Sequence, residues 1–329
     1  MGPGHPSAVP REAISALYPL PMRWSEMRTR LLGALLVALV WGTTSWSQPL
    51  AVSGSLGIEV TFTPIPPATL DITSAITLGL TFGRAEIVSR TELSLAGLLA
   101  QYLTVGVSLD GVALRSGLRF DPCFSRYWFE VRGGCCPLEL GGLFLVENLA
   151  LACQPPNYTV GIVLDLGVAW RPGFFARSVT GFGVTDVYGL IDLEPGTWLT
   201  AVPGVWFEET LLNLGFAGAC FRTDGLVLFD PYGLAWFELG GSYLYPDPEA
   251  ELGVRIRILG TFALDWAKLF FGVRVPPVAV RLVTTFDLGG FLAQDVAVEV
   301  SFSWVRIYSR TRFDFGGLIQ AIVGIELKF

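Results

Sequence analysis

The chain has 329 residues, of which 52% are hydrophobic and 16% are charged, and its formal net charge is −7 at pH 7. A soluble domain is typically about 45–50% apolar and about 25% charged, so the bulk composition is that of a membrane protein. The acidic balance, with no basic cluster along the chain, argues against nucleic acid as a partner.

The first predicted element is a secretory signal peptide. Arg28 and Arg30 precede a short apolar run, residues 31–41, and a small polar stretch follows it. These three regions, in this order, are the layout of an exported leader. A spanning helix needs about 20 apolar residues, so a membrane anchor is the weaker alternative. We therefore divide the chain into an N-terminal extension with its signal peptide, residues 1–47, and a mature part, residues 48–329.

From residue 51 onward, apolar and polar residues alternate along the chain. Clear examples are the runs 70–82, 103–110, 254–258 and 296–304. Alternation with a period of two predicts strands with one apolar face, and short turn signals separate the runs. In lipid, only a helix or a closed barrel satisfies every backbone group. The mature part is therefore predicted to be all-β: a closed, antiparallel transmembrane β-barrel.

An internal repeat and paired glycines indicate hairpins. Thr91–Leu109 aligns without gaps to Thr284–Phe302, with nine identical residues in nineteen positions. Around Gly316 and Gly317, apolar residues occupy odd positions on both sides, as in hairpins whose loops contain an odd number of residues, one of them a left-handed glycine. The rival interpretation is one long strand kinked at the glycines. Hairpins predict about 16 strands, within a range of 12–18, because bacterial barrels use even numbers.

The last predicted strand carries a family resemblance. Residues 321–329 alternate in polarity and end the chain on Phe329. This strand resembles the C-terminal insertion signal of bacterial outer-membrane β-barrel proteins, the broad porin-like group. The resemblance implies export to the outer membrane, insertion by the barrel-assembly machinery, contact with outer-membrane lipid, passage of small solutes or ions, and the option of a homo-oligomer. Two lysines against twenty arginines depart from familiar proteobacterial porins.

The sequence predicts no catalytic, cofactor or metal site. The only histidine is His5, which precedes the predicted mature part. The mature part therefore lacks Ser–His and Asp–His catalysis and the usual histidine-containing metal sites. Glu208 and Glu209 are adjacent carboxylates, but neighbouring strand residues point to opposite faces. We expect no enzyme.

Charged residues on the polar face are the candidate functional residues. An arginine facing lipid at the bilayer midplane costs about 2–4 kcal/mol, so these residues are predicted to line the lumen. They either set ion selectivity or form structural ion pairs in a closed lumen. The set is Glu86, Arg90, Glu92, Arg255, Arg257, Arg306, Arg310, Arg312 and Asp314.

Four of the five cysteines cluster between residues 123 and 153, around turn signals. An exported protein meets an oxidising compartment, so Cys123, Cys135, Cys136 and Cys153 are candidates for disulfides between loops. The alternative is that they are free cysteines that pack as small hydrophobic residues.

The leading functional hypothesis is a passive porin-like diffusion channel of the outer membrane. The second is a structural or surface-interaction barrel with a closed lumen, and the third is a secreted β-sandwich. Porins often fold a long loop into the channel, and the sequence shows no segment that looks like such a loop.

Overall fold

The computed structural model describes residues 50–329, except 122, 136, 150–156, 171–172 and 189–198. The signal peptide assigned to residues 1–47 lies outside the described residues and stays a prediction. Among the residues that are described, no helix is long and apolar enough to cross a membrane. This finding concerns helices alone.

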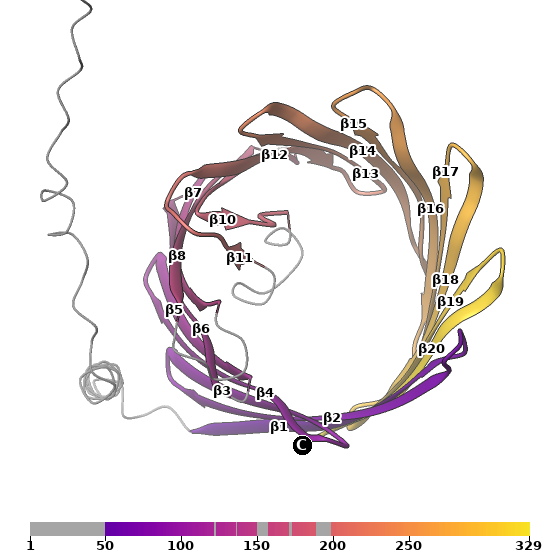
Figure 1. The fold of residues 1–329 in the computed structure, drawn as a ribbon, viewed down its shortest axis with the longest axis horizontal. Helices are drawn as coiled ribbons and strands as arrows, with labels where there is room; N and C mark the ends of the chain where they lie inside the picture. The colour runs from indigo at the N-terminus through magenta and orange to yellow at the C-terminus, as the bar shows by residue number, and fades with distance from the viewer. Residues whose placement is uncertain (1–49, 122, 136, 150–156, 171–172, 189–198) are drawn as a thin grey trace, which may run out of the picture. The chain divides into compact units, whose positions relative to one another are not determined.

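Eighteen strands form one antiparallel sheet that closes into a ring (Figure 1). Chain neighbours pair throughout, except that β9 pairs with β12 because a two-stranded hairpin, β10–β11, intervenes. The strands are β1 (Ala51–Thr63), β2 (Thr69–Phe82), β3 (Ala85–Ser94), β4 (Gly97–Leu109), β5 (Val112–Asp121), β6 (Cys123–Cys135), β7 (Leu138–Asn148), β8 (Tyr158–Trp170), β9 (Phe174–Phe182), β10 (Val184–Thr185), β11 (Thr200–Ala201), β12 (Phe207–Ala217), β13 (Phe221–Asp230), β14 (Gly233–Pro246), β15 (Glu249–Leu259), β16 (Leu264–Val275), β17 (Val278–Asp287), β18 (Gly290–Ser301), β19 (Val305–Asp314) and β20 (Gly317–Lys328).

The two ends of the barrel sequence close the ring. β1 pairs with β20 from Ser55 opposite Lys328 to Phe62 opposite Ala321. Phe329 continues this seam, because its backbone exchanges two hydrogen bonds with Gly54, of 2.9 and 3.0 Å. The predicted closed antiparallel barrel is confirmed. The role of Phe329 as an insertion signal stays a prediction.

The predicted number of 16 strands is wrong, although the observed 18 lies at the upper limit of the predicted range. The difference comes from the connections. Only residues 83–84 separate β2 from β3, and only residues 95–96 separate β3 from β4. Because so little of the chain is spent in turns, its length accommodates one more hairpin than we expected.

The hairpin interpretation of the glycine pairs is confirmed. The repeated segments form the equivalent hairpins β3–β4 and β17–β18. Gly97, Gly290 and Gly317 have φ of 122°, 113° and 112°, a region that favours glycine. A one-residue bulge follows each turn, so two turn residues and one bulged residue give the odd number that the apolar pattern requires.

The two faces of the sheet differ in polarity. On β15, Leu252, Val254 and Ile256 are exposed on the outside of the ring. Arg255 and Arg257 point inward, to carboxylates on β13 and β14. This alternation is the period of two seen in the sequence. A single ring with a charged interior rules out the β-sandwich, which needs two sheets packed face to face.

A segment of the chain folds inside the ring. The inward segment, defined as residues 183–188 and 199–206 between β9 and β12, carries β10 and β11, which lie within the barrel in Figure 1. Its Val184, Val187, Leu199 and Ala201 are almost fully buried and belong to the main apolar cluster of the molecule. The sequence analysis did not identify this inward-folded segment. The physical reason is that this segment is anchored by scattered apolar residues that show no strand period.

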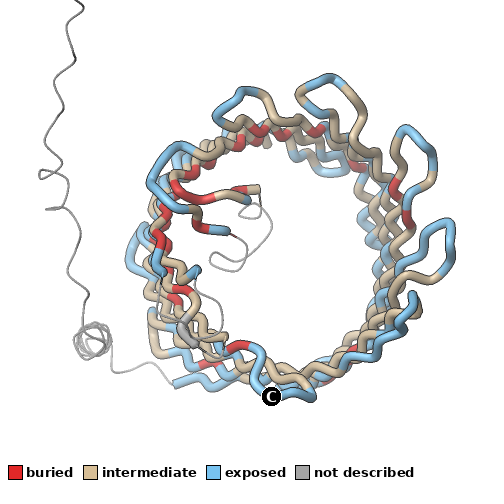
Figure 2. Tube along the Cα trace, viewed as in Figure 1, coloured by how far each residue is buried: buried red, intermediate tan, exposed pale blue. Residues whose placement is uncertain are grey.

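Buried residues gather on the part of the wall beside the inward segment (Figure 2). The inner faces of β7, β8, β9, β12 and β13 contribute Leu145, Val163, Val179, Leu211 and Leu226 to the same cluster. These wall residues sit at positions that would otherwise face the lumen. Within the described residues, the internal apolar cluster therefore lies on this side of the barrel.

Candidate functional site

The structure places eight of the nine predicted lumen residues on the inner face of the barrel. The strand registers fix the faces: Thr77 lies opposite Arg90, Glu238 opposite Arg257, and Ala297 opposite Arg310. The eight residues are Glu86, Arg90, Glu92, Arg255, Arg257, Arg306, Arg310 and Arg312. All eight therefore lie on the lumen side of the wall. Their role in ion selectivity stays a prediction.

Asp314 has a different place. It lies at the tip of the β19–β20 hairpin, where its Oδ1 accepts a hydrogen bond of 2.7 Å from the Gly316 backbone. The equivalent Asp287 accepts one of 2.6 Å from Gly289. The bulge beside this turn lies on β20, so Asp314 keeps the parity of Arg312 and differs only in its place at the end of β19. Its side chain shapes the turn, as aspartate commonly does.

Three wall side chains tether the inward segment. Glu147 on β7 accepts a hydrogen bond of 2.8 Å from the Ala201 backbone, and Thr159 on β8 donates one of 2.8 Å to the carbonyl of Val202. On the other side, Glu209 on β12 accepts one from the Val187 backbone. These bonds satisfy backbone groups that the segment would otherwise bury unpaired. None of the three was predicted from the sequence, because each bond joins residues that are far apart along the chain.

An arginine stacked among aromatic rings lies beside the same segment. The guanidinium carbon of Arg257 is 4.3 Å from the ring centroid of Trp236, 5.0 Å from that of Trp266 and 5.5 Å from that of Tyr188. Tyr188 belongs to the inward segment and meets Trp236 edge to face, with centroids 5.5 Å apart. Such cation–π contacts strengthen when they are shielded from water, so Arg257 links the inward segment to β14 and β16.

The carboxylates buried nearby are paired with arginines. Glu238, with 1% of its side chain exposed, contacts Arg257 and lies 3.3 Å from Arg255, which also reaches Asp224 at 2.7 Å. On β8, the two carboxylate oxygens of Asp165 accept hydrogen bonds from Nε and Nη2 of Arg177, at 2.9 and 2.8 Å. A buried charge is tolerated only when it is paired. These pairs therefore belong to the framework of the wall.

On the far part of the ring the ion pairs are open to solvent. Arg90 and Glu92 are 2.8 Å apart with 54% and 27% of their side chains exposed. Arg312 and Asp295 are 3.8 Å apart and about half exposed. Arg310 has no opposite charge within 4.0 Å in the described part of the chain. Structural ion pairs are therefore found on the covered side, and the role of the exposed charges in ion selectivity stays a prediction.

The cysteine prediction remains open. Cys135 and Cys220 are free and exposed, whereas Cys136 and Cys153 lie outside the described residues, as does the side chain of Cys123. Among the residues that are described, no group of three His, Cys, Asp or Glu side chains is placed to hold a metal ion.

No protein-family model matches the chain. A search of curated proteins also gave no match.

Solved structures of a bacterial porin share the fold. One engineered variant of the porin of Rhodopseudomonas blastica aligns over 85% of this chain and 100% of its own, with a TM-score of 0.52 and 12% identity. A second variant gives the same coverage, a TM-score of 0.51 and 9% identity. A third similar structure, described as "Asymmetric conductivity of engineered proteins", gives the same coverage, a TM-score of 0.51 and 11% identity. This chain therefore has a porin-like β-barrel fold.

Proposed function

We propose that this protein is a passive, porin-like diffusion channel of the bacterial outer membrane for small hydrophilic solutes or ions. The observation that carries the proposal is the closed barrel with an apolar outer face, a charged inner face and a segment folded inside it. The fold shared with a porin supports the same conclusion.

The outer face favours a membrane rather than water. Exposed leucine, valine, isoleucine and phenylalanine side chains occur on strands all round the ring. A soluble monomer rarely exposes a contiguous apolar patch larger than a few hundred Å². In a bilayer, the same surface is buried in hydrocarbon, and the closed ring leaves no backbone edge unpaired.

The inner face favours transport of polar solutes. The inward segment covers one side of the wall, and the charged residues of β3, β18 and β19 on the other side are partly exposed. Water and ions pass most readily along such charged, solvent-facing surfaces. We infer that the conducting path runs between the inward segment and these strands.

The second candidate is a closed structural barrel, favoured by the dense ion pairs around Glu238 and Asp165. We expect neither candidate to be an enzyme, since the predicted mature part has no histidine and the fold neighbours are porins.

The test is single-channel conductance of the full chain inserted in planar lipid bilayers. A diffusion channel gives stable current steps that rise linearly with voltage. Folding is checked separately by circular dichroism and by protease resistance in micelles. A folded, inserted barrel that passes no current contradicts the channel and supports the closed barrel.

A further inference from the structure

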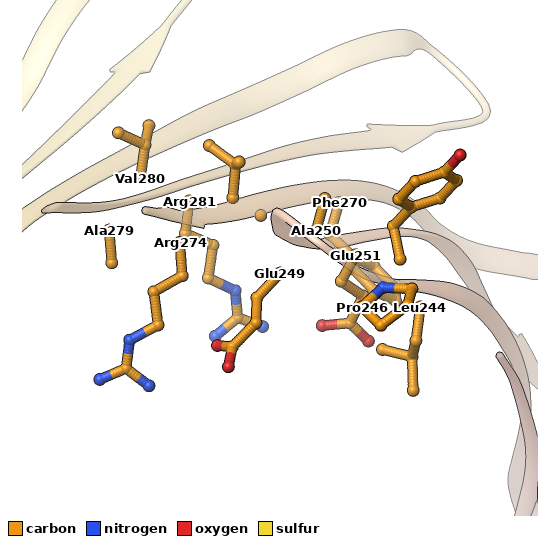
Figure 3. A pocket seen from close by; sticks show the side chains of 13 residues that line it. Leu244, Pro246, Glu249, Ala250, Glu251, Phe270, Arg274, Ala279, Val280 and Arg281 are labelled. Atoms are coloured by element: carbon orange, nitrogen blue, oxygen red, sulfur yellow. The ribbon is translucent and has the colours of Figure 1, made fainter. Parts of the chain in front are cut away.

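A pocket lies away from the inward segment, near the turns that join β14 to β15 and β16 to β17. Its volume is about 450 Å³. Charged side chains from three strands line it, together with Phe270 and Leu244. In Figure 3, Glu249, Arg274 and Arg281 extend to the same side of the sheet, and Val280 extends to the opposite side.

The strand register shows that this side is the lumen. Glu251 lies opposite Gly272, and Gly272 lies opposite Arg281, so the three residues form one row across β15, β16 and β17. Glu251 shares its face with Arg255 and Arg257, which point inward. Neighbouring strands are about 4.8 Å apart, which sets the Cα atoms of Glu251 and Arg281 about 10 Å from each other.

The charges of this row are not neutralised within the wall. No opposite charge lies within 4.0 Å of Glu251 or Arg281 in the described ranges. The same is true of the neighbouring pocket residues Glu249 and Arg274. On other parts of the inner wall, acidic residues such as Glu238 and Asp165 are held by arginines at contact distance. The pocket therefore presents both signs of charge with free hydrogen-bonding capacity.

Gly272 keeps a slot open between the two charges. A Cβ placed there would meet nothing closer than the Val280 carbonyl oxygen, at 3.9 Å. The glycine is thus required neither by crowding nor by a left-handed backbone. Its effect is to leave space between an acidic and a basic side chain.

We infer that this pocket binds zwitterionic α-amino acids, an inference that rests on the proposed channel function for the ligand's route through the lumen. The carboxylate of the ligand would pair with Arg281, since a guanidinium binds a carboxylate through two parallel hydrogen bonds. The ammonium group of the ligand would pair with Glu251, and the ligand backbone would fill the slot over Gly272. Arg274 would add a second positive charge for the carboxylate, and Glu249 a second negative charge for the ammonium group. Phe270 and Leu244 offer apolar surface to a ligand side chain.

Binding to the full-length barrel in detergent tests the inference without any need for conduction. The probes are leucine, 4-methylpentanoate, which lacks the ammonium group, and 3-methylbutylamine, which lacks the carboxylate. Saturation-transfer NMR with titration gives the affinity of each. We expect leucine to bind at least about tenfold more tightly than either half-molecule, because each loses one charge-assisted pair. Equal affinities would overturn the inference.

Two variants with matched controls locate the site. Gly272→Leu fills the slot while retaining every charge, and Gly57→Leu adds the same side chain at an equally open glycine on β1. Arg281→Gln removes the proposed carboxylate partner, and Arg310→Gln removes an unpaired arginine on the same face.

We expect leucine binding to fall at least about tenfold in Gly272→Leu and Arg281→Gln, and to persist in both controls. Equal behaviour of each variant and its control would overturn the site. Since conductance is measured separately, a barrel that conducts without binding leucine refutes this inference alone, and a folded barrel that binds leucine without conducting refutes the channel alone.

Discussion

Two sides of one barrel wall use the same strand pattern for different purposes. The covered wall, β6–β9 with β12–β14 and residues 255–257 of β15, holds buried ion pairs and the apolar cluster beneath the inward segment. The bare wall, β1–β4 with β16–β20, holds partly exposed pairs and unpaired arginines. From this difference we expect a lumen charge to be structural where the chain folds over it and available to solutes where the chain does not.

The largest expected contrast is in stability. Replacing Glu238 by Gln removes the buried carboxylate that contacts Arg257, and leaves Arg255 with Asp224 alone. Breaking a buried pair costs about 3–5 kcal/mol, and we expect a loss of that size in the free energy of unfolding. Guanidinium-induced unfolding of the barrel in micelles measures it.

The matched control on the bare wall is Asp295→Asn, which removes the partner of the half-exposed Arg312. Exposed pairs contribute about 0–1 kcal/mol, so this variant should be nearly as stable as the parent. Equal losses in the two variants would mean that the two walls do not differ as described.

The second contrast concerns the packing of the inward segment. Leu199 is 1% exposed within the apolar cluster, and Leu199→Ala should cost about 2–4 kcal/mol through the cavity it leaves. We also expect the segment to be cut earlier by protease and the current through the channel to become noisier. The control is Leu292→Ala on the outer face of β18, where the side chain is already exposed. A quiet channel with an unchanged cleavage rate would show that other contacts hold the segment.

A smaller effect is expected from one tether. Thr159→Val keeps the shape of the side chain and removes its hydrogen bond to the Val202 carbonyl. The net contribution of such a bond is about 1 kcal/mol, and its loss should raise current noise without changing the mean conductance. Thr285, equally buried on the bare wall, supplies the control Thr285→Val. More noise from the control than from Thr159→Val would contradict the tether.

The same contrast explains how far sequence reasoning reaches. Period-two alternation and the glycine pairs predicted the barrel and its hairpins, because both depend on neighbouring residues. The lumen positions of Arg255 and Arg310 followed from parity for the same reason. The tethers at Glu147 and Glu209 could not be predicted from the sequence pattern. Each joins residues that come close together only after the ring has closed. Parity also did not show that Asp314, which has the parity of Arg312, ends its strand and shapes the turn.

The smallest change in stability, with a clear change in function, is expected at Arg310. It faces the lumen on the bare wall, across Ala297, so Arg310→Gln should alter the free energy of unfolding by less than about 0.5 kcal/mol. Removing a positive charge from the conducting path should shift the reversal potential in a salt gradient toward cation selectivity. Arg177→Gln, which removes an equal charge from the covered wall, should instead lower stability and leave selectivity nearly unchanged. If Arg177→Gln moved the reversal potential as far as Arg310→Gln, the path would run along both walls, and the division between them would fail.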